Sequence, residues 1–157
     1  MTDNEFIDVL RLQAVPHIGD ITAKKLIAHC GSPTAIFEDK MQHLLKIEGI
    51  GRHTLKGLFN KAYKDQAEEE YEFCDRNDLQ LSYFMNSDYP EYLKHCIDSP
   101  ILLFQKRNID LKNRKIISVV GTRNSTSYGM AFCEKFVVEI APLEPIIVSG
   151  FAYGVDI

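Results

Sequence analysis

A hydroxyl-rich loop follows an apolar run near the C-terminal end of the sequence. It reads Val119-Val120-Gly121-Thr122-Arg123-Asn124-Ser125-Thr126-Ser127-Tyr128-Gly129. Hydroxyls and backbone N–H groups at the start of a helix can hold a phosphate, and an arginine can clamp it with two parallel hydrogen bonds. The loop is neither a G-x-G-x-x-G pattern nor a P-loop, so a dinucleotide or nucleoside-triphosphate site is disfavoured. We expect an anion site at Gly121, Thr122, Arg123, Ser125 and Ser127; the alternative is a polar turn in which Arg123 forms a surface salt bridge.

A second loop, Ser149-Gly150-Phe151-Ala152-Tyr153-Gly154-Val155-Asp156, follows the next apolar run. Loops that leave neighbouring parallel strands open at the same carboxyl edge of the sheet, where ligands collect. Ser149 and Gly150 are therefore expected across the pocket from Arg123. The rings of Phe151 and Tyr153 either stack on exposed bases or cover the sheet as core residues.

Two similar segments in the first third of the sequence predict a repeated helical hairpin. They are Val15-Pro16-His17-Ile18-Gly19 and Ile47-Glu48-Gly49-Ile50-Gly51. Glycines in such a turn let backbone N–H groups approach a phosphate, and a following helix adds a positive dipole. The predicted contacts are Gly49, Gly51, Arg52 and Lys56, with Lys24 and Lys25 on the helix after the first copy. The alternative is that the repeats pack on each other or on a protein partner.

Apolar periodicity predicts the elements that position these residues. Helices are expected from a capping box at Thr2 and Glu5, over Asp20–Cys30, from Pro33, through Leu55–Phe59, over 60–77 and over 128–140, and strands over 79–83, 101–104, 116–120 and 146–148. The expected fold is α/β: an N-terminal all-α tandem helix-hairpin-helix (SAM-like) domain at 1–63, then an incomplete extended Rossmann-like parallel sheet at 64–157. One strand-helix-strand unit leaves sheet edges open, so we expect further residues or another chain to complete the sheet.

The composition is that of a globular protein. The 157 residues are 45% hydrophobic and 25% charged, with a net charge of −4. The acidic residues concentrate in Glu68, Glu69, Glu70, Glu72 and Asp75, so a local basic patch for nucleic acid remains compatible with that charge. No apolar run approaches the roughly 18 residues of a membrane span, and the N-terminus is acidic. A cytoplasmic location without a membrane partner is predicted.

The chemically reactive residue types are dispersed. Cys30, Cys74, Cys96 and Cys133 form no C-x-x-C pair, which predicts reduced, mostly buried thiols and no zinc site. No paired carboxylates, nucleophile and base, or metal-ligand cluster stand out, and the five histidines are scattered. We therefore expect a non-catalytic protein without a cofactor or metal.

The two C-terminal loops together resemble the DprA/Smf (DNA processing protein A) family. VVGTRNSTSYG matches its G-S/T-R loop, and IVSGFAYGVD matches its S-G-x-A-x-G-I/V-D loop. Upstream, Asp88-Tyr89-Pro90-Glu91-Tyr92-Leu93 and Asp98-Ser99-Pro100-Ile101-Leu102-Leu103 resemble its Y-P-x-x-L and D-x-P-x-x-L segments. The hairpin repeats resemble its N-terminal domain.

The resemblance implies a protein that binds and protects single-stranded DNA in natural transformation and loads a RecA-type recombinase onto it. It also implies a homodimer formed through the Rossmann-like domain. On this sequence the implied phosphate clamp is Arg123, with Ser125 and Ser127 beside it. Two departures stand out: Tyr153 occupies a commonly basic position, and Lys106-Arg107 replaces a usual glycine.

Two other classes stay open. Rossmann-like domains of this kind also resemble nucleoside-monophosphate phosphoribohydrolases of the lysine-decarboxylase-like family. Their P-G-G-x-G-T loop, with a catalytic arginine and glutamate, is replaced here by Ser-Gly-Phe-Ala-Tyr-Gly at 149–154. The hairpin repeats also fit a protein-interaction module, which would bind its partner without affinity for DNA and without sensitivity to salt.

Overall fold

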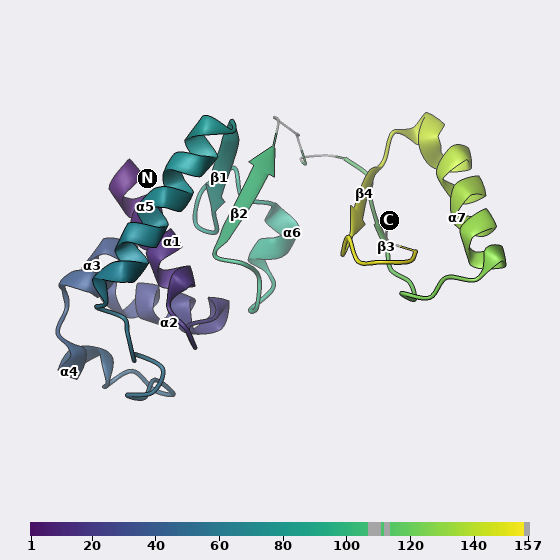
Figure 1. Ribbon diagram of the computed structural model, residues 1–157. Helices are drawn as coiled ribbons and strands as arrows, with labels where there is room; N and C mark the ends of the chain where they lie inside the picture. Colours follow the sequence, from purple (N-terminus) through teal and green to yellow (C-terminus); the bar gives the residue numbers. More distant parts are fainter. Residues whose placement is uncertain (107–110, 112–113, 156–157) are drawn as a thin grey trace. The chain divides into compact units, whose positions relative to one another are not determined.

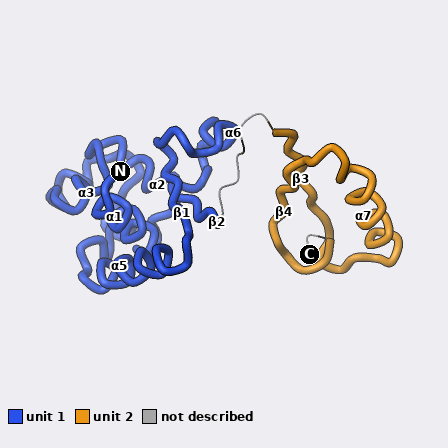
Figure 2. The backbone as a smooth tube through the Cα atoms, turned by 90° about the horizontal axis from the view of Figure 1, so that it is seen from above, with its two compact units in different colours: residues 1–109 blue, residues 110–157 orange. Residues whose placement is uncertain are grey.

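The computed structural model describes residues 1–106, 111 and 114–155 of the chain. It divides into two compact units, residues 1–109 and residues 110–157, which are described separately (Figure 2). The predicted domain boundary between residues 63 and 64 lies inside the first unit, because the helix that begins at Lys61 packs along the N-terminal helix. That boundary stays a prediction.

Five helices precede the first strand of the first unit (Figure 1). They are α1 (Asp3–Ala14), α2 (Asp20–Cys30), α3 (Pro33–Glu38), α4 (Met41–Leu44) and α5 (Lys61–Arg76). Local capping chemistry sets their ends: Thr2 and Glu5 form the predicted capping box, Gly31 ends α2 in the left-handed region at φ 91°, and Ser32 caps α3.

The core of the first unit is aliphatic. Its fully buried side chains come from all parts of the helical region, and they include Val9, Leu12, Leu26, Ile36, Leu44, Leu55 and Leu58. On α5 (Lys61–Arg76), Ala67 and Cys74 are also buried. These contacts join the two hairpin segments into one packed body.

The helix predicted through Leu55–Phe59 is absent, and this expectation was wrong. Residues 52–59 form successive turns instead, with short-range bonds such as Lys56 N–H to His53 O (3.2 Å) and Asn60 N–H to Gly57 O (2.8 Å). Gly57 has φ 88°, in the left-handed region, so a continuous α-helix cannot pass through it. The second hairpin therefore lacks a helix dipole from this segment.

A small antiparallel sheet completes the first unit. Strand β1 (Leu79–Tyr83) pairs with β2 (Leu102–Lys106), with Leu79 opposite Lys106 and Tyr83 opposite Leu102. A short helix, α6 (Glu91–Lys94), lies in the connection. Both strands were predicted, but within the described residues they pair only with each other and do not extend the parallel sheet.

The connection between β1 and β2 is fastened to α2. The Tyr89 hydroxyl donates to Pro100 O (2.6 Å), so the Y-P and D-x-P segments hold each other. Lys24 Nζ donates to Ser99 Oγ (2.8 Å) and Ile97 O (3.1 Å), and Asp20 Oδ1 accepts from Ile101 N–H (2.9 Å). These bonds make residues 84–101 part of the helical unit.

The second unit is a strand-helix-strand arrangement. Strand β3 (Ile116–Val119), helix α7 (Ser127–Ile140), a 3₁₀ turn (Ala141–Leu143) and β4 (Ile146–Ser149) follow in order. The strands are parallel, with Ile116 opposite Ile146 and Val119 opposite Ser149. The α/β class is thus confirmed, whereas the tandem helix-hairpin-helix and Rossmann-like assignments stay predictions.

The cysteines differ from expectation in their burial. All four are free thiols, but only Cys74 is buried; Cys30 and Cys133 are half-buried and Cys96 is exposed. The prediction of mostly buried thiols was therefore wrong. In the part of the chain that the structure describes, no helix has the length and apolar character to cross a membrane.

Candidate anion-binding site

The two loops of the second unit pack directly against each other. Both leave the carboxyl ends of parallel strands, one after β3 and the other after β4. The Val155 N–H donates to Thr122 O (3.3 Å), and a Cβ atom at Gly121 would overlap the side chain of Val155. A Cβ atom at Gly154 would overlap the carbonyl oxygen of Thr122. Glycine at these two positions therefore lets the two loops come into contact.

The first loop is shaped by its own hydroxyls. Thr122 Oγ1 accepts from Asn124 N–H (3.2 Å), and Thr126 Oγ1 accepts from Gly129 N–H (3.1 Å), which caps the 14-residue helix α7. Ser127 is the first residue of that helix and is exposed, while Ser125 is half-buried. The positive end of the helix dipole thus lies at this loop.

Arg123 provides the loop's charge. It is exposed, and the ion pairs found among the described residues do not involve it. It is also the only charged residue in 120–126 and 150–155. The alternative of an Arg123 salt bridge is therefore not seen, and the guanidinium is open to an anion from solvent.

The second loop presents its aromatic rings to solvent. Ser149 Oγ accepts from Phe151 N–H (3.1 Å), Gly150 between them is exposed, and Phe151 has φ 51°, in the left-handed region. The side chains of Phe151 and Tyr153 are 81% and 82% exposed. Within this unit neither ring is a core residue. Asp156, which follows this loop, lies outside the described residues, as does Arg107 of the predicted basic turn.

The predicted hairpin residues are exposed on the surface of the first unit. Gly49 has φ 80°, and Gly51, Arg52 and Lys56 are exposed. The turn can offer N–H groups and two cations to an anion, without a helix behind them. This set therefore forms a smaller candidate site than the sequence suggested.

The two hairpins contact each other, as the alternative interpretation of the repeats allowed. The His17 and His53 rings lie with centroids 4.3 Å apart, and Lys25 Nζ donates to Glu48 O (3.4 Å). His17 has φ 70° and stands at the position that Gly49 occupies in the second copy. This equivalence was the one local feature of the sequence that pointed to His17. Lys24 was also considered for the hairpin surface. Its ammonium group instead donates hydrogen bonds to residues within 96–99.

These features define a class of protein: α/β proteins in which two loops meet at the carboxyl edge of a parallel strand pair. Residues 80–157 match the model of the family described as DNA recombination-mediator protein A. The chain belongs to this family through that part of its sequence. The resemblance to the DprA/Smf family is thereby confirmed.

Two curated relatives are both named DNA processing protein DprA. The DNA processing protein DprA of Bacillus subtilis (strain 168) is 42% identical over 73 residues, which are 45% of this chain and 24% of the relative. The DNA processing protein DprA of Streptococcus pneumoniae (strain ATCC BAA-255 / R6) is 41% identical over 68 residues, which are 43% of this chain and 24% of the relative. The similarity thus spans about a quarter of each relative's length.

Proposed function

We propose that this chain binds single-stranded DNA, without catalysing a reaction on it, through the two loops that follow β3 and β4. The binding residues would be Gly121, Thr122, Arg123, Ser125 and Ser127 from the first loop and Ser149, Gly150 and Phe151 from the second. The observation that supports the proposal is that the two loops pack against each other at Gly121 and Gly154, while Arg123 of the first loop and the aromatic rings of the second are exposed.

The chemistry of these groups fits a single strand better than a duplex. The Arg123 guanidinium can bind a backbone phosphate through two hydrogen bonds. Phe151 and Tyr153 offer flat apolar surfaces, and stacking on such rings contributes about 1–3 kcal/mol per base for single strands. Bases in a duplex are already stacked and paired, so their faces are not free for these rings.

Three finer parts of the proposal concern the protein's role. The family description names a DNA recombination mediator, and both relatives are named DNA processing proteins. We propose that this protein likewise acts in recombination of incoming DNA during natural transformation, that it loads a RecA-type recombinase, and that it forms homodimers in the cytoplasm. We further propose that Gly49, Gly51, Arg52 and Lys56 give the second hairpin a weaker phosphate contact.

The first prediction tests the clamp. Replacing Arg123 with alanine should weaken binding of a fluorescein-labelled oligothymidine about tenfold, because a hydrogen bond to a charged group contributes about 1.5–3 kcal/mol. The salt dependence should also fall, with the slope of log K against log salt decreasing by about 0.7 for one lost phosphate contact. Fluorescence anisotropy over a salt series measures both quantities.

Arg114→Ala is the matched control. Arg114 precedes β3, at the opposite end of that strand from Arg123, and it donates to Glu144 O (2.9 Å). Replacing Arg114 removes the same charge from the same unit. Unchanged affinity in this variant would therefore exclude the explanation that any loss of positive charge in the unit weakens DNA binding. Oligothymidine binding that is equally strong in wild type and Arg123→Ala, or a preference for duplex, would contradict the proposed site.

A further inference from the structure

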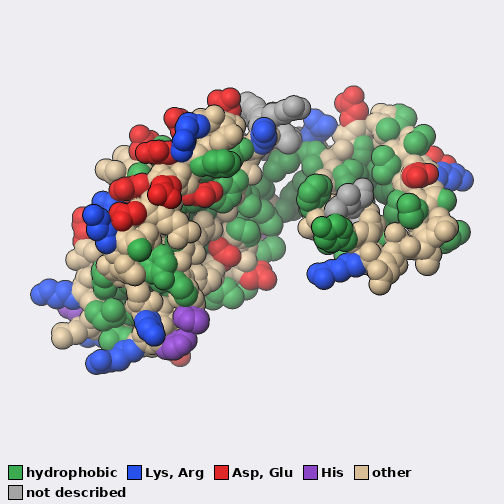
Figure 3. All heavy atoms as spheres, in the orientation of Figure 1, with side chains coloured by type: hydrophobic (Ala, Val, Ile, Leu, Met, Phe, Trp, Pro, Cys, Tyr) green, Lys and Arg blue, Asp and Glu red, His purple; other side chains and the backbone are tan. Residues whose placement is uncertain are grey.

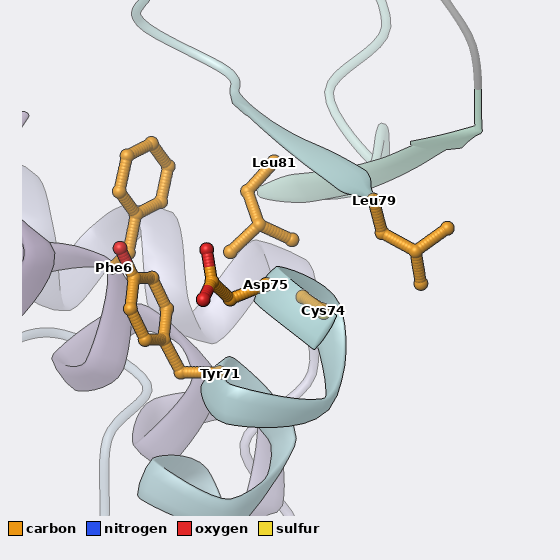
Figure 4. A pocket seen from close by; sticks show the side chains of 6 residues that line it. All are labelled: Phe6, Tyr71, Cys74, Asp75, Leu79 and Leu81. Carbon is orange, nitrogen blue, oxygen red and sulfur yellow. The ribbon is translucent and has the colours of Figure 1, made fainter. Parts of the chain in front are cut away.

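A hollow in the first unit is lined by aromatic rings, leucines and a carboxylate. Its walls are Phe6 of α1, Tyr71, Cys74 and Asp75 of α5, and Leu79 and Leu81 of β1 (Figure 4). The empty space between these walls, open solvent included, is about 340 Å³. That size suits one side chain rather than a cofactor.

The Asp75 carboxylate lies between the Tyr71 ring and Leu81 (Figure 4). None of the ion pairs among the described residues uses it, and the adjacent cation of α5, Arg76, pairs with Glu72 (3.7 Å). Asp75 therefore brings a negative charge to the hollow that its own helix leaves uncompensated.

Tyr71 is held in place on the other wall. Its hydroxyl donates to Asp3 Oδ1 (2.8 Å), which fixes the ring beside Phe6. This hydrogen bond raises the pKa of Tyr71, and burial and the charges of Asp3 and Asp75 act in the same direction. The Asp3 and Asp75 carboxylates bring negative charge close to this wall, which favours a cation.

We propose that this hollow binds the arginine side chain of a protein partner. A guanidinium is planar, so it can lie on the Phe6 and Tyr71 rings while it hydrogen-bonds to Asp75, and its aliphatic stem can pack on Leu79 and Leu81. A small anion or a purely apolar group would leave the carboxylate unpaired. The inference is independent of the loops proposed for DNA.

The surroundings favour a protein rather than a small molecule as the source of the guanidinium. Helix α5 carries six acidic and three basic residues, and acidic side chains gather over it on the surface (Figure 3). Phe73 of the same helix is 50% exposed. A second hollow of about 480 Å³, lined by Leu10, Gln66, Glu70, Phe104 and neighbouring residues, also lies between α1, α5 and the sheet. A basic partner surface would be complementary to this whole face.

The test uses two pentapeptides with blocked ends, Gly-Ser-Arg-Ser-Gly and the same peptide with citrulline in place of arginine. Citrulline has nearly the shape of arginine but no charge. Each is titrated into the ¹⁵N-labelled full chain, and the amide shifts of residues 71–81 are followed. We expect saturable shifts with a millimolar dissociation constant for the arginine peptide and binding about fivefold weaker for citrulline.

Asp75→Asn should remove the preference for arginine, and Phe6→Leu should weaken binding while retaining an apolar wall. Glu69→Gln is the control, because it removes one charge from the same helix outside the hollow and should leave binding unchanged. Well-dispersed amide spectra establish that each variant is folded. Equal binding of the two peptides, or equal loss in Glu69→Gln and Asp75→Asn, would overturn the proposal.

Discussion

At Gly154 a single residue decides whether the two loops can meet. Its backbone has φ 102°, and a Cβ atom there would overlap the carbonyl oxygen of Thr122. Both effects act against any other residue, because L-amino acids with a side chain rarely adopt this conformation. The geometry of the proposed DNA site therefore depends on a residue that contributes no functional group to it.

Gly154→Ala should reduce oligothymidine affinity about as much as Arg123→Ala. The added Cβ atom would push the two loops apart and break the hydrogen bond from Val155 N–H to Thr122 O. Strain of about 1–3 kcal/mol is expected for such a residue. Gly129→Ala is the control, because a Cβ atom there lies 3.4 Å from Thr126 Oγ1, an ordinary contact. Wild-type affinity in Gly154→Ala would show that loop packing is irrelevant to binding.

At the scale of elements, α2 makes two contacts with a distant segment that its own sequence does not reveal. Its first turn supplies Asp20 to the backbone of Ile101, and Lys24 reaches Ser99, which is buried. The Lys24 ammonium also lies 5.6 Å from the centroid of the Phe84 ring. The helix thus fastens the connection between β1 and β2, a segment that belongs to the part of the chain matched by the family.

Lys24→Met should lower the free energy of unfolding by about 1.5–3 kcal/mol, because Ser99 and two carbonyl groups lose a charged donor while the aliphatic stem is kept. Urea denaturation followed by circular dichroism measures this change. The control, Lys64→Met, removes an exposed lysine whose ion pair with Glu68 is expected to contribute at most about 1 kcal/mol. Equal stability of the two variants would rule out a structural role for Lys24.

For the whole molecule, burial is unequal between the two units. The first has an aliphatic core, whereas no side chain described in 110–157 is buried. The exposed apolar residues of the second unit include Met130, Phe132 and Val138 of α7. Since hydrophobic burial dominates folding stability, residues 1–109 should hold nearly all of the cooperative stability of this chain.

Residues 1–109 expressed alone should therefore unfold in one cooperative thermal transition. The midpoint should lie within about 4 °C of that of the full chain, the shift produced by a change of about 1 kcal/mol in a domain of this size. Calorimetry of both proteins gives the comparison. A second transition in the full chain would show that residues 110–157 have cooperative stability of their own. Loss of cooperativity in residues 1–109 would show that this unit depends on the second one.

Local chemistry determined much of this protein. The capping box of Thr2 and Glu5, the helix over Asp20–Cys30 and the strand-helix-strand pattern around Arg123 were readable in the sequence, because each depends on neighbours a few residues away. The family resemblance had the same basis, since its motifs are short and contiguous. Helix prediction failed at Leu55–Phe59, where the periodicity was right but Gly57 turns the chain.

Only the tertiary structure decided the roles that depend on residues far apart in the chain. The bond of Lys24 to Ser99, the contact of His17 with His53, the pairing of β1 with β2 and the placing of Asp75 opposite Phe6 all join distant segments. No local pattern encodes such pairs, because each results from the packing of the whole core. The chemical groups were therefore visible in the sequence, and the packing of the chain determined which of them lie together.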